Sequence, residues 1–589
     1  MEISEKTIPK LEYFPESSIS LPDYGEQSTP HRPWATRITD SFRRDQNAHP
    51  TPKVAVGADG RLYDVEGAAA ATASSPLQRH LKGRHLQMIA IGGSIGTGLF
   101  VSSGSALSTG GPASVLIAFI IIGIMLYCTV HALGEMAVLF PVAGSFSAYS
   151  TRFLDPAWGF AMGWNYAMQW LVVLPLEIVS ATITIEFWNN GAINNDAFVA
   201  IFLFLIIGIN LFGVKGYGEA EFVFSILKVI AVVGFIILGI ILNCGGGPHG
   251  GYIGAKYWYD PGAFNNGFKG LCSVFVTAAF AFSGTELVGL AAAETANPRK
   301  SLPTAVKQVF WRIALFYIVA LTVVGFLVPY TDPRLLNDSS SVNAKASPFV
   351  IAITNAGISG LPSVFNAVIM IAVLSVGNSS IYGSSRTLAA LAEQSQAPKI
   401  LGYIDRQGRP IVSIAVASVV GFLAFFAGSS VNITAFAWML ALSGLSSIFT
   451  WGSICLAHIR FRKAWKLQGH TLDELAFRAQ PGVYGSWIGF LLNVIVLIAQ
   501  FWVGVYPIGW KGMSSSAIAE TFFQAYLAAP IVILSYIGYK FWYNTPIIRS
   551  HNMDLHTGIR ELNVAELIAQ EKAGREAWPA WKRVYKFFC

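Results

Sequence analysis

The chain has 589 residues, of which 53% are hydrophobic and only 12% are charged, and its mean hydropathy is +0.51. Soluble domains carry about 25% charged residues, so this composition excludes an ordinary soluble enzyme, a disordered chain and a collagen-like chain. A membrane-spanning helix needs about 20 consecutive apolar residues, and this chain can supply around a dozen such helices. The net charge of +7 suits basic cytosolic loops, and without a basic stripe with interleaved aromatic residues we expect no nucleic-acid partner.

The two ends of the chain are more polar than its centre. Residues 1–80 are rich in Pro, Ser, Thr and charge, carry no apolar signal-peptide core, and predict a disordered cytosolic tail. Residues 544–589 predict a second cytosolic tail, in which residues 564–574 fit a short amphipathic helix. The chain ends at Cys589 beside aromatic and basic residues, and palmitoylation and an unmodified thiol fit this ending equally well.

Between the tails, residues 81–543 predict an all-α polytopic membrane domain. Its twelve expected spans are 86–107, 112–140, 157–186, 197–213, 222–243, 268–292, 308–329, 349–392, 411–428, 432–458, 483–505 and 519–543. The range 349–392 is too long for one span and fits an interfacial helix followed by a span. With a cytosolic N-terminus, thirteen Lys and Arg residues fall in inside loops and five in outside loops, which predicts that both termini are cytosolic.

The cysteines do not form a recognisable framework. They are Cys128, Cys244, Cys272, Cys455 and Cys589. An odd number at wide spacing, with at least three members in apolar runs, fits neither a disulfide scaffold nor a zinc site. We therefore expect free thiols and no metal or other cofactor.

The first expected span contains four glycines within seven positions, Gly92, Gly93, Gly96 and Gly98. Each glycine weakens a helix by about 1 kcal/mol relative to alanine, so we expect the helix to be interrupted there. In lipid, an open backbone persists only where it faces protein, water or a ligand. The amide groups at the start of the next half-helix, together with the helix dipole, favour a carboxylate.

The sixth expected span contains a similar cluster, Phe280-Ala281-Phe282-Ser283-Gly284-Thr285-Glu286. An ionisable residue such as Glu286 within an apolar run indicates function. A break here leaves carbonyl groups at the end of the first half-helix, and these suit an ammonium group. Interruptions five spans apart predict an inverted-repeat transporter, and donors on one break with acceptors on the other predict an α-amino acid as substrate.

The glycine clusters also fit roles other than a binding site. Close packing between membrane helices is an open alternative for either cluster taken alone. A phosphate-binding loop does not fit, because the first cluster lacks the Gly-Lys-Ser/Thr ending and lies in an apolar span. Two clusters in equivalent spans, one with a buried glutamate, favour the transporter interpretation.

Three further charged residues lie in the expected spans. Glu177 lies in 157–186, Lys228 lies in 222–243, and Glu135 is close to the end of 112–140. Buried acids and amines of this kind exchange protons near neutral pH when their environment disfavours charge. With Glu286, Glu177 and Lys228 therefore predict proton coupling, and the alternative is a static ion pair or a snorkelling side chain. Glu135 is predicted to be a structural or cytosolic gate residue.

Several long motifs follow one another between residue 80 and the C-terminus. They are Leu81-Lys82-Gly83-Arg84-His85 before the first glycine cluster, Gly111-Pro112 with Gly134-Glu135 and Pro141, the second cluster followed by Asn297-Pro298-Arg299-Lys300, and Asp554-Leu555-His556-Thr557-Gly558. With these motifs and its aromatic-Cys ending, the chain resembles the fungal amino-acid permeases, the yeast branch of the amino acid–polyamine–organocation superfamily. The resemblance implies a LeuT-type fold in which spans 1–5 (86–243) and 6–10 (268–458) are inverted repeats, spans 11 and 12 (483–543) are extra, and helices 1 and 6 are discontinuous.

The resemblance also implies import of L-amino acids across the plasma membrane, driven by the proton gradient. It assigns the substrate carboxylate to Thr97 and Gly98. It assigns the substrate amine to Ser94 and to the carbonyl groups of Phe280, Ala281 and Ser283, with Phe280 as an aromatic gate. Ile95, Gly96 and Phe282 complete the expected binding stretch.

The remaining site residues concern coupling and selectivity. Glu286 and Lys228 match family positions linked to proton coupling, and the Lys228 ammonium would lie where a sodium ion lies in related folds. The residues expected to select the substrate side chain are Ala435, Leu442 and Ser443. The pocket stretches carry no acid or base beyond Glu177 and Glu286 for a charged side chain, which favours a neutral or broad substrate range.

Three further function classes are weighed against transport. A transporter-like receptor shares the fold and would bind amino acids without moving them, whereas a channel fits broken helices less well. An enzyme is disfavoured, because the sequence lacks a nucleophile elbow, metal-ligand spacing and a phosphate loop.

Lys6, Lys10 and Lys53 are candidate ubiquitin acceptors, although tail lysines are more often only solubilising. The expected partners are therefore an amino acid, protons, the lipid bilayer and ubiquitin-ligase machinery.

Overall fold

The computed structural model describes residues 39–44, 63–93, 95–189, 192–336, 347–427, 432–559 and 579, without the side chains of residues 427 and 432–434. The chain divides into two compact units, Met1–Arg43 and Arg44–Cys589. In the described part of the first unit, Asp40 pairs with Arg43 at 3.4 Å. The helices named below all belong to the second unit.

The second unit is built from helices, and an isolated bridge joins Leu81 to Thr295. Its first helices are α2 (Val65–Ala73), α3 (Gly83–Gly92), α4 (Thr97–Phe100), α5 (Ser102–Leu139), α6 (Phe146–Phe153), α7 (Pro156–Asn189), α8 (Asn195–Leu211), α9 (Gly213–Asn243) and η1 (Trp258–Gly262). They are followed by α10 (Gly267–Phe282), α11 (Leu287–Leu290), η2 (Ala291–Glu294), α12 (Pro298–Trp311), η3 (Arg312–Val319), α13 (Ala320–Leu327), α14 (Pro333–Leu336) and α15 (Pro348–Asn355). The last are α16 (Leu361–Glu393), η5 (Lys399–Gly402), α17 (Ile411–Gly421), η6 (Phe422–Ala427), α18 (Asn432–Leu467), η7 (Leu472–Glu474), α19 (Gly482–Val505), η8 (Trp510–Gly512), α20 (Ser515–Tyr526) and α21 (Ala528–Tyr543).

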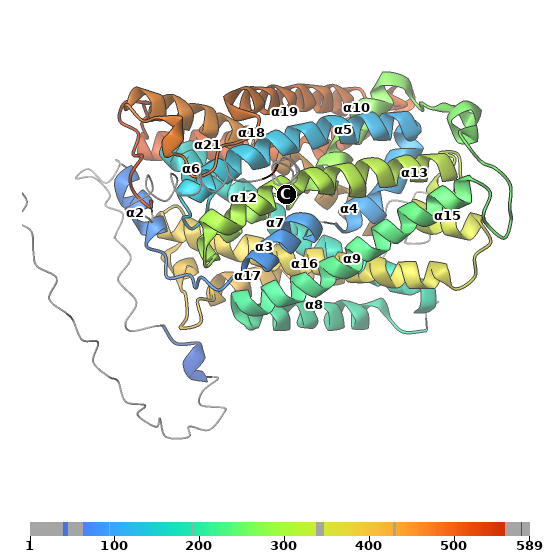
Figure 1. Ribbon diagram of the computed structural model, residues 1–589, viewed down its shortest axis with the longest axis horizontal. Helices are drawn as coiled ribbons and strands as arrows, with labels where there is room; N and C mark the ends of the chain where they lie inside the picture. The colour runs from blue at the N-terminus through green and yellow to red at the C-terminus, as the bar shows by residue number, and fades with distance from the viewer. Residues whose placement is uncertain are drawn as a thin grey trace, which may run out of the picture. The chain divides into compact units, whose positions relative to one another are not determined.

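The long helices pack side by side, and their lengths suit a membrane (Figure 1). Among the described residues, eight helices are long and apolar enough to cross a membrane. The bent pair α20 and α21 makes a ninth if it is counted as one span. Two shorter apolar helices, Asn195–Leu211 and Ile411–Phe426, coincide with two more expected spans. The first expected span corresponds to α3, α4 and the start of α5. The all-α polytopic class is therefore confirmed, and the total of twelve spans stays a prediction.

Two expected boundaries are set by local sequence. The over-long range 349–392 is divided between α15 and α16. Within α5, Gly111 has a φ of +79°, and a Cβ atom there would lie 2.8 Å from the carbonyl oxygen of Ala263. The next residue, Pro112, lacks an amide donor, and the amide of Ala113 instead donates to Ala263 at 2.9 Å. The turn at Gly111 therefore separates the first apolar segment from the second.

Parts of both expected tails are ordered. The sequence of α2 is rich in alanine, Asp64 caps it by accepting from the amide of Gly67 at 2.8 Å, and four of its small side chains are buried. In the C-terminal segment, Leu555 is fully buried and Arg152 of α6 donates to the carbonyl oxygen of Thr557 at 2.8 Å. Residues 65–73, which lie within the expected N-terminal tail, thus form a helix, because small side chains give α2 a packing face. Residues 564–574 lie outside the described residues.

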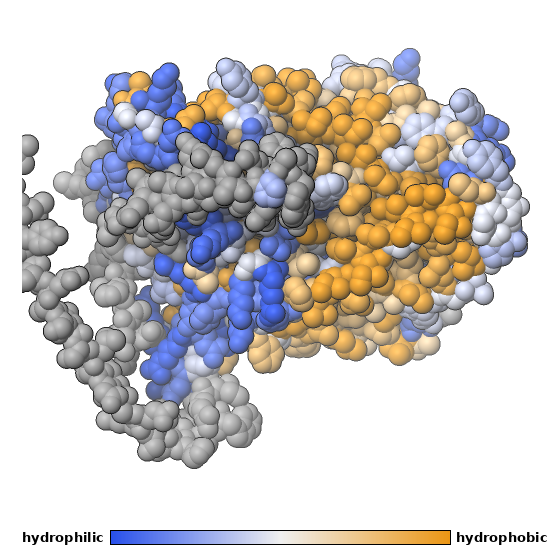
Figure 2. All heavy atoms as spheres, in the orientation of Figure 1, coloured by the Kyte–Doolittle hydropathy of each residue, from blue (hydrophilic) through white to orange (hydrophobic). Residues whose placement is uncertain are grey.

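The surface of the second unit is apolar where it would meet lipid. Figure 2 shows hydrophobic side chains gathered over α9 and hydrophilic side chains towards the end of the molecule near α2. Phe204 on α8, Ile230 on α9 and Ile498 on α19 are each exposed over more than 60% of their surface. Apolar patches of this kind mark a membrane or protein contact, so the chain is a multi-pass membrane protein.

Candidate functional site

The two glycine clusters interrupt their helices and lie against each other. Helix α3 ends at Gly92, and helical structure resumes at Thr97. Helix α10 ends at Phe282, and Gly284 in the following turn has a φ of +94°. A Cβ atom placed on Gly98 would lie only 2.3 Å from the Cα atom of Ala281. The backbones of the two interrupted segments are thus in direct contact, and any side chain at position 98 would displace Ala281.

A small cavity lies beside this contact. Its lining residues are Gly96, Thr97, Gly98, Trp170, Val173, Glu177, Phe280, Ser283 and Val376. The space between its lining residues is about 250 Å³. All nine lining residues are buried, so the structure is closed around the site.

The cavity brings together many predicted residues and adds others that the sequence did not single out. Trp170, Val173 and Glu177 are three and four residues apart on α7, so they share one helix face. Their spacing from Glu177 is the sequence pattern that could have identified Trp170 and Val173 as neighbours of the site. Val376 comes from α16, which approaches so closely that a Cβ atom on Gly96 would lie 2.5 Å from the Val376 side chain.

Other predicted substrate residues do not line the cavity. Ile95, Ala281 and Phe282 are buried beside it. The carbonyl oxygen of Ala281 already accepts a hydrogen bond from the hydroxyl of Tyr317 at 2.7 Å. The position of Ser94 lies outside the described residues.

The predicted selectivity residues lie on α18, outside the lining of the cavity. A Cβ atom on Gly444 would lie 3.4 Å from the Cβ atom of Phe280, so α18 passes close to the expected gate. Next to it, Ser443 is fully buried, and its hydroxyl has no hydrogen-bond partner among the described residues. Leu442 and Ala435 are half-buried.

Glu177 is tied to the first interruption. Its carboxylate accepts a hydrogen bond from the hydroxyl of Thr97 at 2.6 Å, and both side chains are buried. Thr97 is one of the two residues expected to receive the substrate carboxylate. A carboxylate bound at Thr97 would therefore lie beside the carboxylate of Glu177.

Glu286 is folded back onto the second interruption. Both of its carboxylate oxygens lie 3.1 Å from the amide of Gly284, and one accepts from the indole nitrogen of Trp451 at 3.2 Å. The side chain is fully buried. It therefore satisfies a backbone donor that the break in the helix leaves open.

Lys228 joins the first interruption to two other helices. Its ammonium group donates to the carbonyl oxygen of Gly92 and to the hydroxyl of Ser375 on α16, each at 2.8 Å. It also lies 3.5 Å from Glu221 on the same helix. Glu221 was not singled out from the sequence, because the expected span began at residue 222 and left it outside.

Arg312 is a second buried cation that the sequence analysis did not assign to the site. Its guanidinium donates to the carbonyl oxygen of Ala90 at 3.1 Å and to the hydroxyl of Tyr317 at 3.2 Å. Tyr317 in turn donates to Ala281. Arg312 thus connects α3 and α10, the two segments that precede the interruptions. Its position in the apolar range 308–329 was the signal for it.

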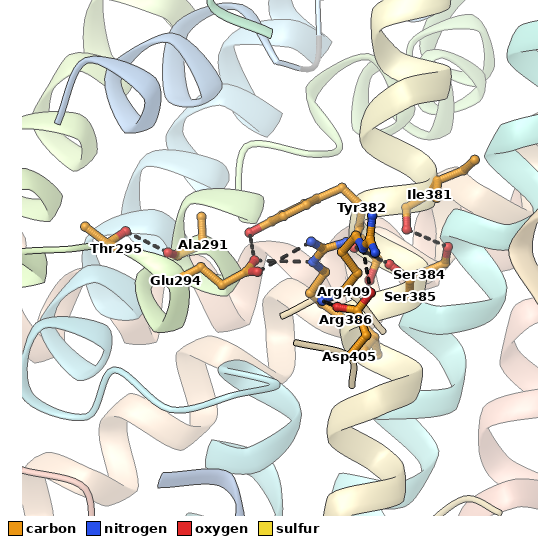
Figure 3. A network of polar contacts seen from close by, with 12 residues as sticks. Ala291, Glu294, Thr295, Ile381, Tyr382, Ser384, Ser385, Arg386, Asp405 and Arg409 are labelled. Atoms are coloured by element: carbon orange, nitrogen blue, oxygen red, sulfur yellow. Dashed lines mark hydrogen bonds and ion pairs between the residues drawn. The ribbon is translucent and has the colours of Figure 1, made fainter. Parts of the chain in front are cut away.

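Two further buried networks hold the helices around the site. Figure 3 shows the first, in which Glu294 accepts from the hydroxyl of Tyr382 at 2.7 Å and pairs with Arg386 at 3.3 Å. This network fixes η2, the end of the interrupted sixth segment, to α16. In the second, Glu135 accepts from His458 at 3.0 Å and from Arg462 at 2.9 Å. The contacts of Glu135 join α5 to α18, and its role as a structural or gate residue stays a prediction.

The described residues contain no group of three or more His, Cys, Asp or Glu side chains that could hold a metal ion. The cysteines Cys128, Cys244, Cys272 and Cys455 are free thiols. Cys589 lies outside the described residues.

Comparisons with known proteins agree on one family. A family model described as amino acid permease matches residues 85–552. General amino-acid permease GAP2 of Candida albicans is 59% identical over 96% of this chain and 95% of its own length. General amino-acid permease GAP1 of Saccharomyces cerevisiae is 56% identical over 97% and 94%, and cationic amino acid transporter 1 of Schizosaccharomyces pombe is 52% identical over 89% and 88%.

Proposed function

Because the chain belongs to the amino acid permease family, which is a family of transporters, we propose that it imports L-amino acids across the plasma membrane by proton symport. In this proposal the substrate binds between the two interrupted segments, and the protein exposes that site alternately to each side of the membrane. The observation that carries the proposal is the small closed cavity, lined by backbone from both interruptions and by the buried carboxylate of Glu177.

The two sides of the cavity offer opposite chemistry. Helix α4 begins at Thr97, so the amides of Thr97 and Gly98 belong to its unsatisfied first turn and suit a carboxylate. Helix α10 ends at Phe282, so the last carbonyl groups of this segment suit an ammonium group. Phe280 and Ser283 line the cavity on that side. Ser94 is proposed to help bind the substrate amine. The Ala281 carbonyl would contribute through its second lone pair, because Tyr317 uses the first.

Charge balance supports protons as the coupling ion. Five ionisable side chains are buried around the two interruptions. Two are cations, Lys228 and Arg312, and three are carboxylates, Glu177, Glu221 and Glu286. If all five were ionised, the group would carry a net negative charge in an environment that penalises it. A proton on one carboxylate removes that charge. Glu177 is well placed to take it, because a substrate carboxylate near Thr97 would repel an ionised neighbour.

The substrate range is proposed to be neutral or broad. The described lining of the cavity carries one ionisable side chain, Glu177, and its carboxylate is engaged by Thr97. Two of the relatives are named general permeases. Ser443, Leu442 and Ala435 on α18 are proposed to tune the choice of side chain. We also propose that both termini are cytosolic. Regulation at the plasma membrane is proposed to act through ubiquitin on Lys6, Lys10 and Lys53 and through a lipid on Cys589.

The test is uptake of a panel of labelled amino acids by purified protein in liposomes under an imposed proton gradient. We expect accumulation that follows the gradient in the parent protein and fails in Glu177→Gln, which removes the carboxyl group proposed to take the proton, and in Glu286→Gln. Glu520→Gln is the matched control, because Glu520 is exposed on α20. Binding without accumulation in an intact parent protein would favour the receptor alternative and contradict the proposal.

A further inference from the structure

Glu221 is a fully buried carboxylate two turns into α9. It lies 3.5 Å from the ammonium group of Lys228, and it accepts a hydrogen bond from the hydroxyl of Ser375 at 2.7 Å. The hydroxyl of Ser225, one turn further along α9, lies 3.1 Å from its other oxygen. A buried carboxylate is costly unless it is paired and hydrogen-bonded, and Glu221 is both.

The same contacts satisfy Lys228 completely. An ammonium group has three donors, and the three acceptors within reach are the Gly92 carbonyl oxygen, the Ser375 hydroxyl and Glu221. Gly92 is the last residue of α3, at the first interruption. The approach is close, since a Cβ atom on Gly92 would lie 2.3 Å from the Ser225 hydroxyl oxygen. The end of α3 therefore rests on a layer of polar groups that Glu221 organises.

Other charged groups act on Lys228 from a greater distance. Glu177 from α7 and Arg312 from η3 interact with it electrostatically. From α16 it meets the neutral Ser375, and from α3 it meets the backbone of Gly92. Among the described residues, Glu221 is the carboxylate in direct contact with Lys228.

We propose that Glu221 is a positioning residue for the coupling step. Before that step it holds the charged ammonium group of Lys228 against the Gly92 carbonyl at the first interruption, and in that step it takes the proton of Lys228. The inference rests on the proposed proton symport. When a proton passes from the Lys228 nitrogen to a Glu221 oxygen, an N–H bond breaks and an O–H bond forms. An amine and a carboxylic acid then replace the ion pair, with no change in total charge. The neutral amine binds the Gly92 carbonyl more weakly, so α3 is released to move.

The experiment compares Glu221→Gln with Glu219→Gln in the same liposomes. Glu219 is the matched control, because it lies on the same helix but is 42% exposed and pairs with Arg84 at the surface. Two readouts are needed for each variant, namely accumulation driven by the proton gradient and exchange of labelled for unlabelled amino acid without a gradient. The pH profile of both is recorded.

We expect Glu221→Gln to lose about tenfold or more of gradient-driven accumulation, within the usual range of coupling between two ligands. Exchange without a gradient should change much less in this variant. The pH dependence of its transport should flatten, and Glu221→Asp should recover part of the gradient-driven accumulation. Glu219→Gln should behave like the parent. Normal accumulation in Glu221→Gln, or an equal loss of accumulation and exchange with an unchanged pH profile, would overturn the inference.

Folding is controlled with a double variant. If Glu221→Gln alone does not fold, Lys228→Met combined with Glu221→Gln removes both charges of the pair. Recovery of folded, substrate-binding protein that exchanges but does not accumulate supports the inference, and failure to recover overturns it. A parent that binds amino acids but never accumulates them would refute the proposed symport itself. A parent that accumulates beside a normal Glu221→Gln variant refutes the inference alone.

Discussion

Replacing Gly98 with alanine separates the two interrupted segments at their point of contact. The added Cβ atom would lie 2.3 Å from the Cα atom and 2.8 Å from the Cβ atom of Ala281. Both neighbours are buried, and the nearest one is backbone, so no flexible side chain can move aside. The substitution therefore forces α4 and α10 apart.

The size of the effect follows from this geometry. Ordinary van der Waals contact begins at 3.4 Å, so the two backbones must separate by about 1 Å. Overpacking of a filled core usually costs about 1–3 kcal/mol, which a folded protein can survive. A displacement of about 1 Å in a site of positioned groups costs about 100-fold in rate. We therefore expect Gly98→Ala to fold with modestly reduced stability and to lose about 100-fold in transport.

The assay is uptake in liposomes, normalised to folded protein measured by size-exclusion chromatography. Gly208→Ala is the matched control, because a Cβ atom on Gly208 of α8 would meet no atom within 4 Å. We expect Gly208→Ala to transport at the parent rate. Parent-level transport by Gly98→Ala would refute the direct contact between the two interruptions, and with it the proposed place of the substrate.

Two further predictions concern the buried networks outside the cavity. Arg386→Met leaves the carboxylate of Glu294 buried without its cation, and removing one partner of a buried pair costs about 3–5 kcal/mol. The double variant with Glu294→Gln should recover most of the thermal stability, and an equally unstable double variant would contradict this account. Asp554 lies in the C-terminal segment. Burial raises the pKa of its carboxyl group, but Arg152 and the amides of His556 and Thr557 lower that pKa by more. The pKa of Asp554 therefore lies below its ordinary value of 3.8. Its contribution to stability is thus present above about pH 3.8 and lost as the pH falls through the lower folded-state pKa, and Asp554→Asn should lose this pH dependence in thermal unfolding of detergent-solubilised protein.

Local sequence patterns were sufficient for much of the architecture. The length of each apolar run predicts a membrane helix whatever its neighbours are, because the bilayer sets the requirement. The four glycines of 92–98 and the single Gly284 predict where helices 1 and 6 lose their regular structure, because glycine weakens a helix at any position. The observed interruptions before Thr97 and after Phe282 fall within these two clusters. Glu177, Lys228 and Glu286 could be singled out because a charge within an apolar run is unusual.

Only the tertiary structure shows which groups meet. The contact of Gly98 with Ala281 joins residues far apart in the chain, and no local pattern encodes their distance. The sequence did not predict that Glu221 lies in a membrane helix, because α9 begins at Gly213, before the expected start of the span at residue 222. That end of the helix is polar, so its extent depends on partners supplied by α3 and α16. Hydropathy can place a charge at a given depth, but the partner that makes its burial tolerable comes from the packing of other helices.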